Sequence, residues 1–160
     1  MKRLIWLAII AGIILSIPVI ALANRDRDNV EEILSNLIDQ ADQEGYEIID
    51  TAVDSVDTET NMIYTLDVTP GTYVFYAESG DNIDNLDMSV FLEDDYDNGD
   101  DPFVTDDLDN NTPAVQFDVY EDTTIVALVS GVDFARRQDS GYFCILFTKL
   151  REEDSGHHGK

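Results

Sequence analysis

The sequence is poor in basic residues, and this shortage limits what the chain binds. Nine Lys and Arg residues stand against 34 Asp and Glu residues, and none occurs between Arg27 and Arg136. Nucleic acids and anionic membranes are recognised through basic patches, so both are excluded as partners of the charged part of the chain. The formal net charge of −25 suits a cation, a basic protein or a neutral glycan, and it equally suits a role in solubility alone.

Cysteine and histidine are also scarce. Cys144 has no partner for an intramolecular disulfide and lies in the apolar stretch 142–147, which predicts a buried and unreactive thiol. His157 and His158 lie in the polar tail 151–160, which we expect to be disordered. Nucleophilic triads need an ordered imidazole, and zinc prefers His and Cys ligands. The sequence therefore predicts no catalytic residues, no enzyme activity and no zinc site.

The chain begins with a basic and then an apolar segment. Lys2 and Arg3 precede an uncharged run from Leu4 to Ala23, which ends in Ala-Leu-Ala, the small-x-small pattern that signal peptidase accepts. We expect residues 1–23 to be a signal peptide, which places the protein in the periplasm or outside the cell. The run is also long enough to span a bilayer, so a retained anchor is the open alternative.

Residues 24–45 predict one amphipathic helix. Asp28 and Glu31 have the spacing of a capping box at its start, and Gly45 suits its end. The apolar residues recur at helical spacing: Val30, Ile33, Leu34, Leu37, Ile38 and Ala41.

Residues 46–150 show a period of two, which predicts a mainly β domain. The spacing of the strands favours one antiparallel β-sandwich of about seven or eight strands, of the jelly-roll or immunoglobulin-like kind. Pro70-Gly71 predicts a hairpin between two of these strands. The stretches 124–129 and 142–147 are apolar on both faces, so we expect Val30, Leu34, Leu37 and Ile38 of the helix to cover both.

Acidic residues are concentrated between Asp81 and Asp109, where twelve of the 29 residues are Asp or Glu. Clustered oxygen ligands on loops are what Ca²⁺ requires, whereas the partial EF-hand spacings from Asp95 and Asp107 each lack a correctly placed glycine. We expect these negative connections to gather at one end of the sandwich. Calcium and a solvated acidic rim without an ion are the two interpretations left open.

Four stretches within residues 62–149 give a family resemblance. They are the turn-linked strands 64–75, the strand Asp84-Asn-Leu-Asp-Met-Ser-Val-Phe-Leu92, the acidic loop and strand 105–117, and the closing strand 140–147. Together they resemble the bacterial pre-peptidase C-terminal domain, a small β-sandwich appended to secreted peptidases and collagenases. The resemblance covers about half the chain, without the helix and the first strand, and no peptidase is attached here.

This resemblance implies a sandwich in which the loop before Leu86 meets the loop around Asp106. Some relatives bind calcium through acidic loop residues, and others bind extracellular matrix protein. The calcium ligands implied in this chain are Asp84, Asp87, Asp106, Asp107 and Asp109.

These observations favour an exported, non-catalytic binding or stabilising module, with calcium as an optional ordering ion. Its expected partner is an envelope or extracellular protein or glycan, for which Phe91, Tyr96 and Phe103 are candidate contact residues. A carboxylate-based secreted hydrolase stays open, and it would need two carboxylates converging in a pocket. A structural envelope component also stays open, and it would leave the apolar stripe of the helix exposed.

Overall fold

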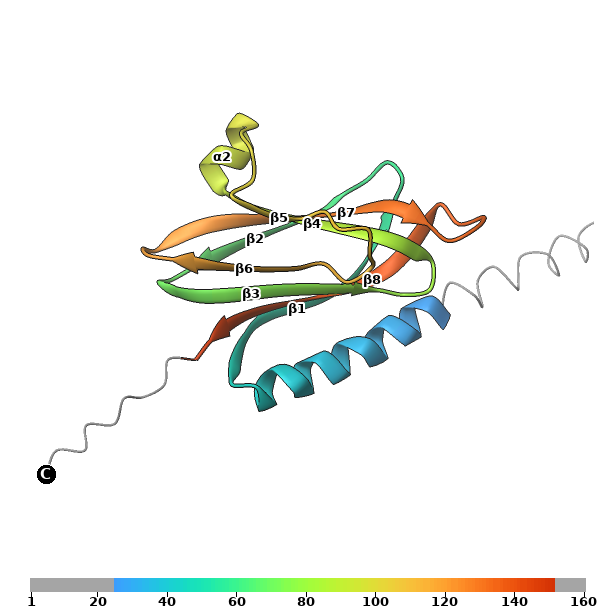
Figure 1. Cartoon of the computed structure of the whole chain (residues 1–160), viewed down its shortest axis with the longest axis horizontal. Helices are drawn as coiled ribbons and strands as arrows, with labels where there is room; N and C mark the ends of the chain where they lie inside the picture. Colours follow the sequence, from blue (N-terminus) through green and yellow to red (C-terminus); the bar gives the residue numbers. More distant parts are fainter. Residues whose placement is uncertain (1–24, 152–160) are drawn as a thin grey trace, which may run out of the picture.

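The computed structural model describes residues 25–151, which form two four-stranded antiparallel sheets packed face to face (Figure 1). The strands are β1 (Tyr46–Asp57), β2 (Met62–Val68), β3 (Gly71–Ser79), β4 (Ile83–Leu92), β5 (Val104–Asp106), β6 (Ala114–Val119), β7 (Thr123–Phe134) and β8 (Ser140–Leu150). One sheet has the strand order β1-β8-β3-β6, and the other has the order β2-β7-β4-β5. The predicted mainly β antiparallel sandwich is thus confirmed.

Two helices accompany the sheets. The described part of the N-terminal helix covers residues 25–43, and a short helix, α2, covers Glu93–Asn98. The N-terminal helix agrees with the sequence prediction, whereas α2 was not predicted. The predicted leader, residues 1–23, and all but the first residue of the predicted tail lie outside the described residues. Within residues 25–151, no helix combines the length and the apolar character that crossing a membrane requires.

Alternation of residue type along the strands directs one face of each sheet into the core. In β6, Val115, Phe117 and Val119 are buried, whereas the residues between them are exposed. Tyr64 of β2 and Phe147 of β8 meet edge-to-face across the two layers, with ring centroids 5.3 Å apart. Burial of apolar surface of this kind stabilises a fold by about 25 cal/mol per Å².

The turn at Pro70-Gly71 does not form the predicted hairpin. β2 pairs with β7 in one sheet, whereas β3 pairs with β6 and β8 in the other, so the turn carries the chain between the layers. Tyr73 fixes this crossing, because its hydroxyl accepts from Thr69 N at 3.1 Å and donates to Thr69 O at 2.7 Å. A Pro-Gly pair predicts a reversal, but whether the flanking strands pair depends on the distant partners that each strand finds.

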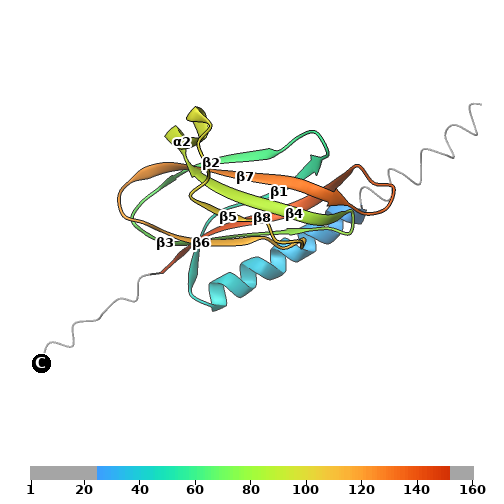
Figure 2. The same ribbon diagram turned by 45° about the horizontal axis from the view of Figure 1, so that its top comes forward.

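The N-terminal helix lies along the outer face of the β1-β8-β3-β6 sheet (Figures 1 and 2). Its residues Val30 and Ala41 are buried, and the rest of its apolar stripe is half-buried. Asp26 connects the helix to the sheet, since its Oδ2 accepts a hydrogen bond from the backbone N of Tyr142 at 2.9 Å. The predicted contact of the helix with the stretch 142–147 is therefore confirmed.

The predicted contact of the same helix with the stretch 124–129 is wrong. That stretch belongs to β7, which is in the other sheet. The outer face of β7 lies instead beside α2, where the Tyr96 ring meets Phe91 edge-to-face at 5.4 Å and Phe91 is the strand partner of the buried Val126. The residue pattern indicates only one helix, whereas the structure has a second, α2, beside β7.

The start of the N-terminal helix also differs from the prediction. Residues 25–27 are already helical, so Asp28 lies inside the helix and the predicted capping box does not form. Glu31 instead pairs with Arg27 one turn before it, at 2.9 Å.

Candidate functional site

The two acidic loops implied by the family resemblance do meet. Leu86 N donates to Asn110 O at 2.9 Å, and Asn110 N donates to Asn85 Oδ1 at 3.2 Å. β4 then pairs with β5 so that Met88 lies opposite Asp106. The contact that the sequence implied between these loops is therefore present.

The predicted metal ligands in these loops are engaged differently. Asp106 holds the connection between β5 and β6, because Oδ1 accepts from Leu108 N at 3.2 Å and Oδ2 accepts from Ala114 N at 2.9 Å. Asp87 is half-buried, and its Oδ1 has no hydrogen-bond partner. Burial first, and then the charges of Asp107 and Asp106, raise the pKa of Asp87 above its usual value.

Asp84 and Asp109 are exposed, and so is Asp107. Across residues 25–151, no three acidic, histidine or cysteine side chains are arranged to hold a metal ion. The charges of Asp107 and Asp106 act on Asp87, but both carboxylate oxygens of Asp106 already accept hydrogen bonds from backbone groups. Calcium at these five residues stays a prediction from the sequence.

The acidic residues do not gather at one end, contrary to the expectation. β4 separates them, with Asp81 and Asp84 near its first residue and the α2 acids after its last. Glu93, Asp94 and Asp95 occupy the first turn of α2, where negative charge is favourable. Each end of the sandwich is therefore acidic.

The end of the sandwich after β4 also carries an apolar hollow of about 280 Å³. We call it the end hollow, and its lining residues are Leu92, Phe103, Asp118, Val119, Tyr120, Glu121, Thr123 and Ile125. The buried Ile125 belongs to this lining, whereas Leu92 is 41% exposed, Phe103 44% and Tyr120 86%. Large apolar side chains exposed together in a concavity are typical of contact surfaces.

Local structure sets the positions of the aromatic residues in the end hollow. Phe103 N donates to Val90 O at 3.0 Å, and the Phe103 ring lies edge-on against Phe117 at 5.3 Å. Tyr120 follows β6 directly, in the turn before β7, and points out of the core because Val119 before it is buried. The Phe103 ring is thus held against the core, whereas the Tyr120 ring is exposed to solvent and accessible to a partner.

The end hollow has negative walls. Asp118 and Glu121 both line it, and no Lys or Arg does. Asp118 is held by Thr72, whose hydroxyl donates to its Oδ1 at 2.6 Å. A surface that combines exposed aromatic rings with carboxylates suits a partner with basic and apolar side chains.

Sequence reasoning identified part of this surface. Of the three candidate contact aromatics, Phe103 lines the end hollow, whereas Phe91 is buried and Tyr96 covers it. Tyr120 was missed, because it follows Val119 in an alternating pattern and so looks like one more strand residue on the outer face of the sheet. Its position before Glu121-Asp122, outside the strand, is the signal that marks it as an exposed turn residue.

Cys144 is buried, as predicted. Its Sγ donates to Glu78 O at 3.5 Å, and burial, followed by the nearby charge of Glu78, raises the pKa of the thiol to about 12. A thiol in this state is protonated at neutral pH and is a poor nucleophile.

The fold defines the class of the protein as a small antiparallel β-sandwich, and comparison with solved structures finds similar ones. It is similar to the periplasmic g-type lysozyme inhibitor PliG of Aeromonas hydrophila, at 14% identity over 64% of this chain and 85% of that one, with a TM-score of 0.49. It is also similar to the pre-peptidase C-terminal domain of collagenase from Bacillus anthracis, at 12% identity over 61% of this chain and 87% of that one, with a TM-score of 0.46. The resemblance stated from the sequence is confirmed as a likeness of fold.

No family model matches the sequence, and no curated protein matches it.

Proposed function

We propose that this protein is an exported, non-catalytic binding module that contacts an envelope or extracellular protein through the end hollow. The observation that supports this proposal is the group of exposed apolar side chains there, Leu92, Phe103 and Tyr120, beside the carboxylates of Asp118 and Glu121. Covering these three side chains removes apolar surface from water, and the carboxylates select a basic partner over an acidic one.

Site-specific photo-crosslinking tests the proposal. A photoreactive phenylalanine analogue replaces Tyr120 in one variant, and in the matched control it replaces Ile63, a residue 49% exposed on β2 and outside the end hollow. After irradiation in the producing cells, we expect a discrete crosslinked protein from position 120 alone, and Phe103→Ala should reduce its yield. Equal products from both positions would falsify the proposed surface.

A glycan is the alternative partner for the same surface, because sugars stack on exposed aromatic rings. Treatment of the crosslinked product with protease and, separately, with glycosidases distinguishes the two. A product that glycosidases reduce to the mass of this chain, and whose protease digest contains no foreign peptide, would replace the protein partner by a glycan.

Calcium ordering is a separate proposal, because it depends on Asp84, Asp87, Asp106, Asp107 and Asp109 rather than on the end hollow. The support for it is the unpartnered Oδ1 of Asp87 beside two further carboxylates, since a divalent cation relieves repulsion among such groups. Its test is thermal unfolding with calcium, with magnesium and with chelator, and a rise in stability specific to calcium is expected. Equal and weak effects of the two ions would leave only charge screening.

A further inference from the structure

The N-terminal helix leaves part of the sheet beneath it uncovered. Ala41 is buried against the sheet, but the next strand outward, β3, presents Val74 and Tyr76 only half-buried. β6 follows β3 at the edge of the sheet, and its exposed Ala114 and Gln116, the strand partners of Tyr76 and Val74, do not line this space. A groove of about 220 Å³ therefore runs between the helix and β3, and we call it the helix groove.

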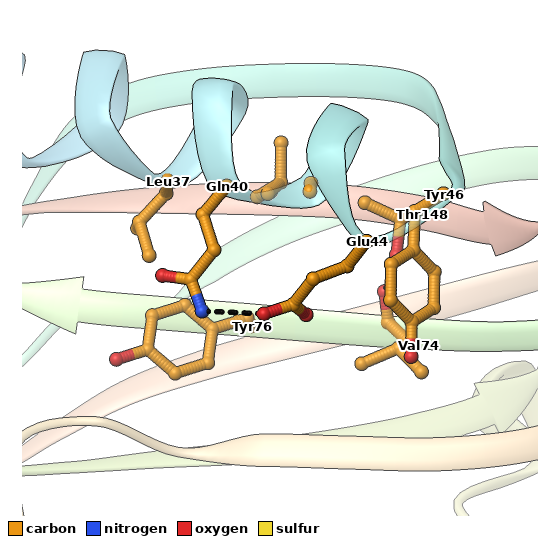
Figure 3. Close-up of a pocket in the computed structure, with 9 residues that line it drawn as sticks. Leu37, Gln40, Glu44, Tyr46, Val74, Tyr76 and Thr148 are labelled. Atoms are coloured by element: carbon orange, nitrogen blue, oxygen red, sulfur yellow. Dashed lines mark hydrogen bonds between the residues drawn. The ribbon is translucent and has the colours of Figure 1, made fainter.

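The helix groove combines an apolar floor with a carboxylate. Leu37, Val74 and Leu146 line it, together with the rings of Tyr46 and Tyr76. In Figure 3 the carboxylate of Glu44 projects from the helix between the two tyrosine rings. No Lys or Arg lines the groove.

Hydrogen bonds hold Glu44 and Tyr76, two of the polar residues that line the helix groove. Gln40 Nε2 donates to Glu44 Oε1 at 2.8 Å, which holds the carboxylate over the groove and leaves Oε2 as a free acceptor (Figure 3). The Tyr76 hydroxyl donates to Glu78 Oε2 at 2.9 Å, and burial together with this carboxylate raises the pKa of Tyr76. Tyr76 is therefore uncharged at neutral pH, and its ring forms one wall of the helix groove.

Aromatic faces and a carboxylate select a cation, and an apolar floor selects one on an alkyl stem. We propose that the helix groove holds a lysine side chain presented by a basic partner protein, with the stem on Leu37, Val74 and Leu146 and the ammonium group at Glu44. Arginine fits less well, because a bidentate guanidinium pair needs both carboxylate oxygens and Gln40 already occupies one.

This inference does not depend on the proposed function, because the helix groove and the end hollow share no lining residue. The helix groove is open to solvent, so a side chain that enters it can stay attached to a larger molecule. The strongly negative surface of the protein favours the approach of a basic protein.

NMR titration of the full chain, expressed with its own leader, tests the inference at low ionic strength. The probes are Nα-acetyl-lysine methylamide, its uncharged norleucine counterpart, its arginine counterpart and spermidine. We expect the lysine probe to shift the amides of Ala41, Tyr46, Val74 and Leu146, and to bind about fivefold tighter than the norleucine probe. Equal binding of the two would overturn the proposal, and so would tighter binding of the arginine probe or of spermidine.

Two variants with the same change of charge separate the groove from the general acidic field. Glu44→Gln removes the carboxylate at the helix groove, whereas Glu47→Gln removes an exposed carboxylate three residues later that does not line it. We expect Glu44→Gln to weaken the lysine probe about fivefold and Glu47→Gln to leave its binding almost unchanged. Equal losses in both variants would show that only the overall charge attracts the probe. Tyr120→Ala should leave this titration as it is, whatever the outcome at the end hollow.

Discussion

Replacement of Gly80 by alanine should loosen the N-terminal helix, although alanine is otherwise compatible with this position. Gly80 is buried and its φ is not positive, so alanine can adopt its backbone conformation. A Cβ there would collide with Oδ1 of Asp26 and would lie 3.0 Å from Cγ2 of Val30. Gly80→Ala must therefore displace Asp26, which is only 6% exposed.

The displacement has a cost that can be worked out from the contact it breaks. Moving Asp26 removes the hydrogen bond to Tyr142 N and leaves a partly buried donor unpaired, which costs about 1–3 kcal/mol. Replacement of glycine by alanine restricts the unfolded chain and returns about 0.4–1 kcal/mol. We therefore expect Gly80→Ala to lower the free energy of unfolding by about 1 kcal/mol, and by no more than about 2.6 kcal/mol.

A double-mutant cycle with Asp26→Ala is the decisive assay. Without the carboxylate most of the collision disappears, so Gly80→Ala should be neutral or slightly stabilising in that background. Urea unfolding of the chain from Asn24 onward gives the four free energies, and we expect a coupling of about 1 kcal/mol or more. Hydrogen exchange in residues 25–43 should become faster in each single variant. If Gly80→Ala costs the same with and without Asp26, the proposed contact does not hold the helix.

Three further predictions follow from the buried and charged groups. Asp87→Asn should stabilise the protein at neutral pH in the presence of chelator, because the folded state raises the pKa of Asp87 and so disfavours its charged form. The gain over the native chain should vanish as the pH falls below 3.8, the ordinary pKa of an aspartate, because Asp87 is then protonated in both the folded and the unfolded chain. Urea unfolding at a series of pH values measures this. With calcium present, the native chain should become more stable than Asp87→Asn if the acidic loops bind the ion, because only the chain that keeps Asp87 gains stability. Cys144 should react with a thiol reagent at pH 8 only as fast as the fold opens, and a rate equal to that of a free thiol would contradict its burial.

Strand positions could be predicted from the sequence, because a half-buried strand carries its own period of two. The strand predicted over residues 84–92, for example, is β4 (Ile83–Leu92), which begins one residue earlier. Pairing could not be predicted at Pro70-Gly71, because β2 and β3 each pair with a strand that lies far along the chain. Thr72 of β3, for example, is paired with Asp118, 46 residues later. Local residues determine that the chain turns, whereas distant residues determine which layer it enters.

The candidate sites, too, could be predicted from the sequence only in part. The contact between the loops at Asn85 and Asn110 was implied by a resemblance that spans both. The end hollow could not be predicted, because it brings together Leu92 from the end of β4 with Phe103 and Tyr120 from two separate connections. The helix groove depends on how far the helix lies from β3, and Ala41 in the sequence reveals a small residue but not the space beside it.

The order of the strands has a consequence for the passage of the chain out of the cell. β8, at the C-terminal end of the fold, lies between β1 and β3, and β7 lies between β2 and β4. Without β7 and β8 only the strand pairs β3-β6 and β4-β5 can form, so a chain whose last two strands are still being translocated has no closed core. If the protein is exported, as we propose, this topology keeps the earlier strands threadable during transit and postpones folding until the final segment is released.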